Sequence, residues 1–306
     1  MTKVQVKKEH KFLGHKSSIY RVEESSDGKY FFSCGGDGFV VVWNIEDPDN
    51  GEVVAKVPNS VYCIGYSEDD DLLYVGHNYD GLHVIDWRNK KEVGSLKLTD
   101  GEIFDIKRWK EFIFVATGDG EIIKINAKTL EVDSRVKLSD KNCRTLTFRS
   151  DVDEMAVGFS DNCIRIMNPN TLEVLFVMEE HSKSVFSLVY SSDNKLLLSG
   201  SMDAHLMIWN VEEGYTLQQD IVAHMYAINA IAYSPDDSHF VTASMDKTIK
   251  VWDAKTFQLL KVIDKVRHEG HLTSVNSIFW SSLNGRVISC SDDRSISIWD
   301  IKFESL

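Results

Sequence analysis

The sequence predicts an all-β fold, a seven-bladed β-propeller whose blades are four-stranded antiparallel sheets. Three observations in the 306 residues lead to this expectation. Similar segments recur about every 40 to 47 residues along the chain, a spacing typical of propeller blades. Each segment holds a short strand, an Asp-centred turn and a second strand rich in β-branched residues. The N-terminus offers one strand more than its own unit needs, and the last unit lacks one, as a closed ring requires.

Four copies of the repeat nearly superimpose and end in Trp-Asp or Trp-Asn. They are SCGGDGFVVVWN (33–44), SGSMDAHLMIWN (199–210), TASMDKTIKVWD (242–253) and SCSDDRSISIWD (289–300). Three weaker copies lie between the first two: VGHNYDGLHVID (75–86), ATGDGEIIKIN (116–126) and VGFSDNCIRIMN (157–168). The positions equivalent to the Trp are Trp43, Ile85, Ile125, Met167, Trp209, Trp252 and Trp299. In the second unit we expect the strand after the turn to be one residue short.

A single domain is expected over residues 1–306, because no low-complexity linker interrupts the repeats. The expected blades cover approximately residues 14–57, 58–98, 99–138, 139–178, 179–222, 223–263 and 264–306. Few residues follow Trp299-Asp300, so the seventh sheet needs its outer strand from elsewhere. Residues 4–13 are expected to supply it, which closes the ring and leaves no inner edge exposed.

Composition limits the partners. The formal net charge of −13 and the lack of a basic stripe disfavour nucleic acid and anionic membranes, and would steer basic partners toward the chain. The five cysteines are odd in number and form no C-x-x-C pair, which fits a reducing compartment. The N-terminus has no apolar signal segment, and no apolar run is long enough for a membrane span. We therefore expect a cytoplasmic protein.

A Gly-His or a lone His precedes each strong repeat, and with the Trp-Asp endings the chain resembles the WD40 family over essentially its whole length. The resemblance implies a buried network of His, Ser or Thr, Asp and Trp in four blades. The implied sets are His15, Ser33, Asp37 and Trp43; His181, Ser199, Asp203 and Trp209; His224, Thr242, Asp246 and Trp252; and His271, Ser289, Asp293 and Trp299. Blades two to four keep a turn Asp (Asp80, Asp119, Asp161) but lack a matching His or Trp.

Ser, His and Asp together also occur in hydrolases. A nucleophile needs an exposed cleft and an oxyanion hole, whereas a triple repeated four times around a ring fits a structural role. The six remaining histidines show no H-x-x-x-H or H-E-x-x-H spacing, and His268 and His271 have no clear third ligand. We therefore predict no catalytic residue, no metal site and no cofactor.

The resemblance places the first strand of each blade along the central channel. These strands begin SIYRV (18–22), SVYCI (60–64), EIFDI (102–106), NCRTL (142–146), SVFSL (184–188), AINAI (227–231) and SVNSI (274–278). Their second and fifth residues are apolar in every blade, so both are expected in the core. A spacing of three breaks strand alternation and predicts a β-bulge between them. The third residues are mixed and are expected at the channel rim: Tyr20, Tyr62, Phe104, Arg144, Phe186, Asn229 and Asn276.

In the WD40 family the rim also takes the residue before each turn Asp and the first residue of the inner strand. That implication adds Tyr79, Met202, Met245, Asp292, Glu102 and Asn142. Aromatic residues, Met and Arg are enriched at protein interfaces, which favours a binding face. Packing of the aromatic rings between blades is the alternative. In the longer loop 264–271, Arg267, His268 and Glu269 are expected to project from the same face, either as a functional lip or as an inert insertion.

The sequence therefore predicts a non-enzymatic scaffold that binds a protein or peptide, basic or with an apolar anchor, and is monomeric on its own. A propeller hydrolase or metal enzyme is one alternative. An architectural subunit that uses its blade edges is another.

Overall fold

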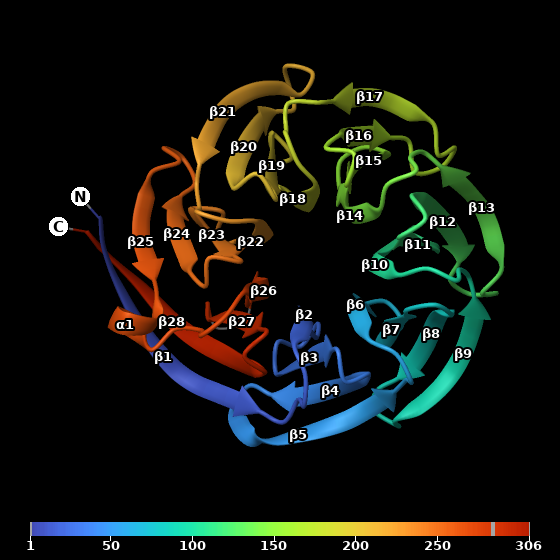
Figure 1. The fold of residues 1–306 in the computed structure, drawn as a ribbon, viewed down its shortest axis with the longest axis horizontal. Coiled ribbons are helices and arrows are strands. Elements are labelled where there is room, and N and C mark those ends of the chain that lie inside the picture. Colours follow the sequence, from blue (N-terminus) through green and yellow to red (C-terminus); the bar gives the residue numbers. More distant parts are fainter. Residues whose placement is uncertain (1, 283–284, 306) are drawn as a thin grey trace.

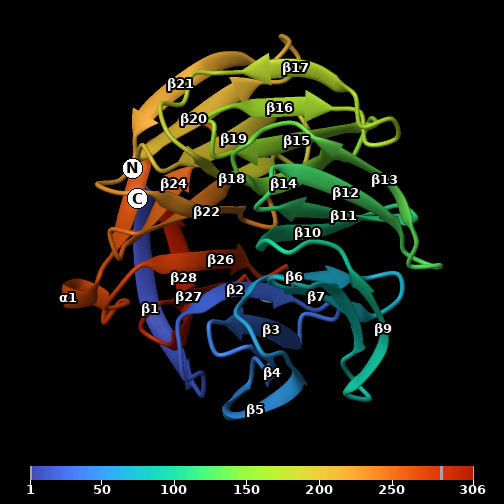
Figure 2. The same cartoon turned by 45° about the vertical axis from the view of Figure 1, so that its right-hand side comes forward.

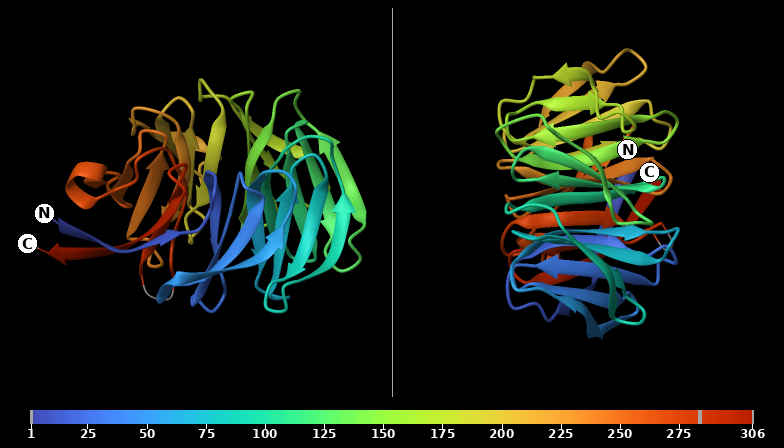
Figure 3. Two further views of the ribbon diagram at one scale, coloured as in Figure 1. Left: turned by 60° about the horizontal axis from the view of Figure 1, so that its bottom comes forward. Right: turned by 90° about the vertical axis from the view of Figure 1, so that its right-hand side faces the viewer.

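The computed structural model describes residues 2–282 and 285–305, which form seven four-stranded antiparallel sheets around a central axis (Figure 1). The predicted all-β propeller of seven blades is confirmed. Residues 1, 283–284 and 306 of the expected domain lie outside the described residues. The short helix α1 (Lys265–His268) occupies the loop 264–271 and lies at the outer perimeter, beside the strand that closes the ring and away from the channel (Figures 1 and 3).

Within each blade the strands run in order from the axis outwards. Blade 1 has β2 (Ile19–Glu24), β3 (Tyr30–Gly35), β4 (Phe39–Asn44) and β5 (Asp47–Lys56). Blade 2 has β6 (Val61–Ser67), β7 (Leu72–His77), β8 (Gly81–Asp86) and β9 (Lys91–Lys97). Blade 3 has β10 (Ile103–Trp109), β11 (Phe112–Thr117), β12 (Glu121–Asn126) and β13 (Val132–Lys137). Blade 4 has β14 (Cys143–Arg149), β15 (Glu154–Phe159), β16 (Ile164–Met167) and β17 (Val174–Met178).

The remaining blades follow the same plan. Blade 5 has β18 (Val185–Tyr190), β19 (Leu196–Ser201), β20 (His205–Asn210) and β21 (Thr216–Val222). Blade 6 has β22 (Ile228–Tyr233), β23 (His239–Ser244), β24 (Ile249–Asp253) and β25 (Leu259–Ile263). Blade 7 has β26 (Val275–Trp280), β27 (Val287–Ser291), β28 (Ser295–Ser305) and, as its outer strand, β1 (Thr2–Leu13).

The apolar core lies between the blades, whose sheets face one another around the ring (Figure 2). Side chains of a strand alternate between the two faces of its sheet, so the middle strands must be apolar on both. On β3, Phe31 packs toward blade 7 and Phe32 toward Ile64 and Leu73 of blade 2. Both rings are fully buried. In the seven inner-strand segments, the first of which is SIYRV (18–22), the second and fifth residues, such as Ile19 and Val22, are likewise buried, as their apolar pattern predicts.

The ring is closed by the N-terminal strand, as predicted. β1 pairs antiparallel with β28 from Leu13 opposite Ser295 to Thr2 opposite Ser305, so both ends of the chain leave the disc together (Figure 3). Phe12 anchors this strand to the first blade. Its buried ring meets Phe31 edge-on at 5.2 Å and Trp43 edge-on at 5.5 Å between ring centroids.

Four blades contain the same hydrogen-bonded chain, which we name the tie. In blade 1, Trp43 Nε1 donates to Ser33 Oγ at 2.7 Å, Ser33 Oγ lies 2.8 Å from His15 Nε2, and His15 Nδ1 lies 3.1 Å from the Asp37 carboxylate. Asp37 also accepts from the backbone N–H groups of Lys16 and Phe39. The same contacts join His181, Ser199, Asp203 and Trp209; His224, Thr242, Asp246 and Trp252; and His271, Ser289, Asp293 and Trp299.

Blade 2 departs from the alignment expected for it. Val75 pairs with His83 as Ser33 pairs with Val41, so the strand after the turn is not shortened. The turn bond from Asp80 N to His77 O corresponds to that from Gly38 N to Gly35 O. Asp80 therefore stands one position beyond the turn Asp of the other blades, and Tyr79 takes that position with a φ of 66°.

Blades 3 and 4 replace the tie with simpler contacts. In blade 3, Thr99 precedes the inner strand where the tie has its histidine, and its hydroxyl donates to Asp119 at 2.6 Å. In blade 4, Arg165 binds both oxygens of Asp161 at 3.1 and 2.8 Å. The turn Asp thus remains bonded, but no buried indole joins these contacts.

Candidate functional site

Every inner strand carries a β-bulge near its start. In β2 the pairing with β3 shifts between Ile19 and Arg21, which leaves Tyr20 as the extra residue. The other six inner strands shift at the equivalent place. A bulge re-aims the side chain of its extra residue. The bulged residue, Tyr20 in blade 1, can therefore face the axis, while the apolar residues one position before it and two positions after it stay in the core.

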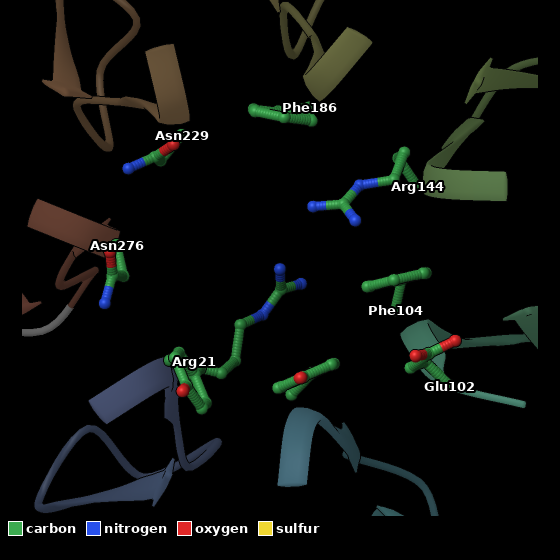
Figure 4. A pocket seen from close by; sticks show the side chains of 9 residues that line it. Arg21, Glu102, Phe104, Arg144, Phe186, Asn229 and Asn276 are labelled. Carbon is green, nitrogen blue, oxygen red and sulfur yellow. The ribbon is translucent and has the colours of Figure 1, made fainter. Parts of the chain in front are cut away.

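These bulged residues surround a cavity of about 420 Å³ at the channel mouth (Figure 4). Its lining is Tyr20, Arg21, Tyr62, Glu102, Phe104, Arg144, Phe186, Asn229 and Asn276. All seven residues expected at the third position are among them, as is Glu102. Tyr20, Tyr62, Phe104 and Phe186 are partly exposed, so their rings are not sealed between the blades.

One side of the cavity is an aromatic arc. Tyr20 meets Tyr62 edge-on with ring centroids 5.0 Å apart, and Tyr62 stacks on Phe104 at 5.7 Å. The arc continues through Arg144, whose guanidinium lies 3.9 Å from the centroid of Phe104 and 4.6 Å from that of Phe186. Cation–π contact of this kind holds the guanidinium in place without using its N–H donors.

Arg144 is a desolvated cation with free donors. Burial lowers its pKa to about 10, so the side chain is still charged at neutral pH. Within the described residues its Nε is buried without a hydrogen-bond partner, and no carboxylate lies within 4.0 Å of its guanidinium nitrogens. Unpaired buried donors cost free energy, so an acceptor that reaches them would be bound favourably.

Sequence reasoning missed Arg21 and Asp105, which pair across the channel. Arg21 Nη2 donates to Asp105 Oδ1 at 3.1 Å, and Asp105 also accepts from the backbone N–H groups of Leu146 and Ile106. Burial alone would lower the pKa of Arg21, but the charge of Asp105 outweighs it and raises the pKa. The available signal was the fourth position of the inner strands, which is small or uncharged in the five other blades.

The two asparagines opposite the arc bind neighbouring blades. Asn229 Nδ2 donates to Val275 O at 2.9 Å, and Asn276 Nδ2 donates to Ile19 O at 2.9 Å. Asn276 also donates to Asp292 at 2.7 Å. Their amide groups are thus used within the ring, which leaves the arc and Arg144 as the chemically available part of the lining.

The rim beyond the cavity carries exposed apolar side chains. Met202 and Met245 are about half exposed, and Asn142 lies partly exposed at the start of its inner strand. Met225 and Tyr226, which sequence reasoning missed, are also exposed, and Met225 N donates to the turn carboxylate of Asp246. The available signal was the adjacent Met and Tyr in the loop between blades 5 and 6.

The backbone position predicted for Tyr79 was wrong. It does not precede a turn Asp, because Asn78 occupies the position equivalent to Met202 and is buried, with its Oδ1 accepting from Ile103 N at 2.9 Å. Tyr79 is nevertheless exposed, and its hydroxyl donates to Glu102 Oε1 at 3.1 Å. It therefore reaches the rim from a different backbone position than the alignment implied.

The described residues contain one group that could hold a metal ion, His77, Asp80 and His83 of blade 2. It lies outside the cavity lining and was not anticipated from the spacing of the histidines. Over the described range, no helix has the length and hydropathy to cross a membrane.

Fold and site together define a seven-bladed β-propeller with an aromatic and cationic channel mouth. A family model described as "WD domain, G-beta repeat" matches residues 6–44, 172–210, 215–253 and 263–300, just over half of the chain. The chain belongs to the WD40 repeat family.

Relatives and a solved structure agree with this assignment. The chain is 25% identical over 230 residues to apoptotic protease-activating factor 1 of Danio rerio, a match covering 72% of this chain and 18% of that protein. It is 23% identical over 213 residues to WD repeat-containing protein SL1-17 of Schistosoma mansoni, covering 70% and 57%. It spans less than two thirds of either relative. The crystal structure of the WD40 β-propeller domain of Doa1 matches with a TM-score of 0.85 over 96% of this chain and 97% of that chain; at 16% identity this shows the shared fold alone.

Proposed function

We propose that the protein is a non-enzymatic scaffold that holds a protein or peptide at the channel mouth. The observation that carries this proposal is the cavity in which Tyr62, Phe104 and Phe186 surround the guanidinium of Arg144, which has no ion-pair partner among the described residues. Such a site suits an apolar anchor side chain packed on the rings, with a carbonyl or carboxylate oxygen of the partner on Arg144. The net charge of −13 assists the approach of basic partners.

The hydrolase alternative has little support from the ties. The hydroxyl-bearing residues Ser33, Ser199, Thr242 and Ser289 are fully buried, so a substrate cannot reach them. Each hydroxyl also accepts from a tryptophan N–H, so it is held inside the hydrogen-bonded chain of the tie.

A second candidate, an architectural subunit, is favoured by β17. This outer strand of blade 4 presents four consecutive apolar residues, Val174 to Val177, each between 39% and 52% exposed. An apolar edge strand can pair with another chain. Association through this edge would use the side of the disc rather than the channel.

Affinity capture with two matched variants separates the candidates. We expect the triple variant Tyr62→Ala, Phe104→Ala, Phe186→Ala to lose the proteins captured by the parent chain, as read by mass spectrometry. The double variant Leu175→Ala, Phe176→Ala should keep them. Loss with the edge variant alone would support the architectural role, and parent-like capture by the rim variant would refute binding at the channel mouth. Circular dichroism must show both variants folded; unfolding of the rim variant would mean that its rings serve packing.

We infer a cytoplasmic setting and a monomer in the absence of its partner. All five cysteines are free thiols, as expected in a reducing compartment. Light scattering at increasing concentration tests the monomer, and a dimer abolished by Leu175→Ala, Phe176→Ala would identify the edge of blade 4 as the contact.

A further inference from the structure

Strands β7 and β8 form a hairpin in blade 2 (Figure 1). Three side chains of metal-ligating type meet on this hairpin. His77 is the last residue of β7 and pairs with Gly81, Asp80 stands in the turn, and His83 lies two residues beyond Gly81 on β8. Residues two apart on a strand share a face, so both imidazoles project from the same side of the sheet. The hairpin thus brings together ligands separated by only three residues each.

Their ligand atoms converge at the spacing that a tetrahedral ion needs. His77 Nδ1 lies 3.2 Å from Asp80 Oδ2 and 3.2 Å from His83 Nε2, and His83 Nε2 lies 3.9 Å from Asp80 Oδ2. Zinc ligands at about 2.0–2.1 Å in tetrahedral geometry are separated by roughly 3.3–3.4 Å. Small rotations of the side chains would therefore admit a zinc ion among these three atoms.

A carboxylate behind His83 orients it for this task. Glu92 of β9 lies with Oε2 3.0 Å from His83 Nδ1, so it accepts that N–H and leaves the lone pair of Nε2 directed at His77. Histidine ligands of zinc commonly donate their other ring N–H to a carboxylate in this way. Asn59 lies 3.5 Å from His77 Nε2, and its amide must turn its oxygen inward when His77 ligates through Nδ1.

The cluster takes the place of the missing tie. Val57 stands four residues before Val61, where His15 stands before Ile19, and Tyr79 occupies the position of the turn Asp. The polar contacts of His77, Asp80 and His83 therefore cannot be a remnant of the tie.

From this geometry we propose that His77, Asp80 and His83 form a zinc-binding site, with Glu92 as its positioning residue. Two imidazoles and one carboxylate suit Zn²⁺ rather than Mg²⁺ or Ca²⁺, which prefer all-oxygen sites. The side chain of His77 is 8% exposed, that of His83 18% and that of Asp80 42%, so the site opens on the side of Asp80, where water can be the fourth ligand. Three ligands on one hairpin would also stabilise blade 2, which is one of the three blades without a tie.

Calorimetric titration of the chelator-stripped chain with ZnCl2 tests the site. We expect one zinc ion per chain, at least a 100-fold loss of affinity for His83→Gln and for Asp80→Asn, and about a 10- to 100-fold loss for Glu92→Gln. Zinc should raise the melting temperature of the parent chain but not of His83→Gln. MgCl2 should give no comparable binding.

His205→Gln is the matched control. His205 Nδ1 lies 2.6 Å from Asp220 on blade 5, a histidine–carboxylate pair with comparable exposure but without a second histidine. This variant should bind zinc as the parent chain does. If the parent chain does not bind one zinc ion in the titration, or if His83→Gln and Asp80→Asn bind zinc as tightly as the parent chain, the cluster is only a hydrogen-bond network. Asp80 is a surface turn residue, so we expect Asp80→Asn to remain folded. Its zinc affinity therefore tests the site even if His83→Gln unfolds.

Discussion

At the scale of single residues, the tie works because its hydrogen bonds run in one direction. Trp209 Nε1 donates to Ser199, the Ser199 hydroxyl can donate to His181 Nε2, and His181 Nδ1 can donate to Asp203. Each buried polar group has a partner, and Ser199 is both acceptor and donor. Removing the hydroxyl therefore leaves an indole N–H and an imidazole nitrogen unpaired at once.

We predict that Ser199→Ala lowers the free energy of unfolding by about 1–3 kcal/mol for each buried group left unsatisfied. Urea denaturation measures this change. Ser192→Ala, at an exposed position of the same blade, should have no comparable effect. Equal stability of the two variants would contradict the role of the tie.

The ties also set the response to acid. Burial lowers the pKa of His15 and His224 and outweighs the opposing effect of Asp37 and Asp246. Burial would raise the pKa of Asp203, but its bonds to His181 and to backbone N–H groups hold it below its usual value. In all three groups the folded pKa is the lower one, so the unfolded chain binds more protons as pH falls.

Stability should therefore be complete above the unfolded pKa of each group and decrease on acidification. We predict a decline beginning near pH 6.5 from the histidines and a further decline below about pH 4 from the aspartates. Urea melts between pH 8 and pH 3.5 measure it, and His224→Gln should flatten the first part of the curve. A gain in stability between pH 6.5 and pH 5 would show that the histidines are stabilised in their charged form.

At the scale of the strand, the bulge decides which residues line the cavity. The bulge was predicted correctly from the apolar residues at the second and fifth positions of each inner-strand segment. In a regular strand, residues three apart point to opposite faces, so both could not lie on the same face. Comparing equivalent positions of the inner strands does not predict contacts between side chains of different blades. Arg21 and Asp105 belong to blades 1 and 3 and join only because the ring is narrow at the axis.

The blades should differ in how readily they open. Blades 2, 3 and 4 lack the buried indole of the tie, so we predict several-fold faster hydrogen exchange in β8, β12 and β16 than in β20 and β24 when a chelator is present. Mass spectrometry of peptides from these strands provides the measurement. Uniform protection in all seven blades would show that Thr99 and Arg165 replace the tie fully.

At the scale of the whole molecule, the fold depends on closure between the two ends of the chain. Each core cluster lies between two blades, so an open ring would leave the faces of blades 1 and 7 without a partner. Phe12 completes this junction because it belongs to the last sheet but packs on Phe31 and Trp43 of the first.

We predict that Phe12→Ala lowers the free energy of unfolding by about 3–5 kcal/mol, as expected when a fully buried ring is removed. Leu13→Ala is the neighbouring control, since Leu13 is 63% exposed. Thermal and urea melts compare the two. Similar stability of both variants would mean that β1 holds the ring by its backbone pairing alone.

The sequence by itself determined the blade number, the closing strand and the buried columns, and its resemblance to the WD40 family added the four ties and the place of the third-position residues at the channel. Most of these features recur in every repeat, so a pattern that is weak in one unit can be recognised by comparison with the others. Tertiary structure alone decided the pairing of Arg21 with Asp105, the place of Tyr79, the exposed rim at Met225 and the meeting of His77 with Asp80 and His83. Each of these features depends either on the backbone path of one turn or on the distance between two blades. Residue type and spacing along the chain do not give that path or that distance.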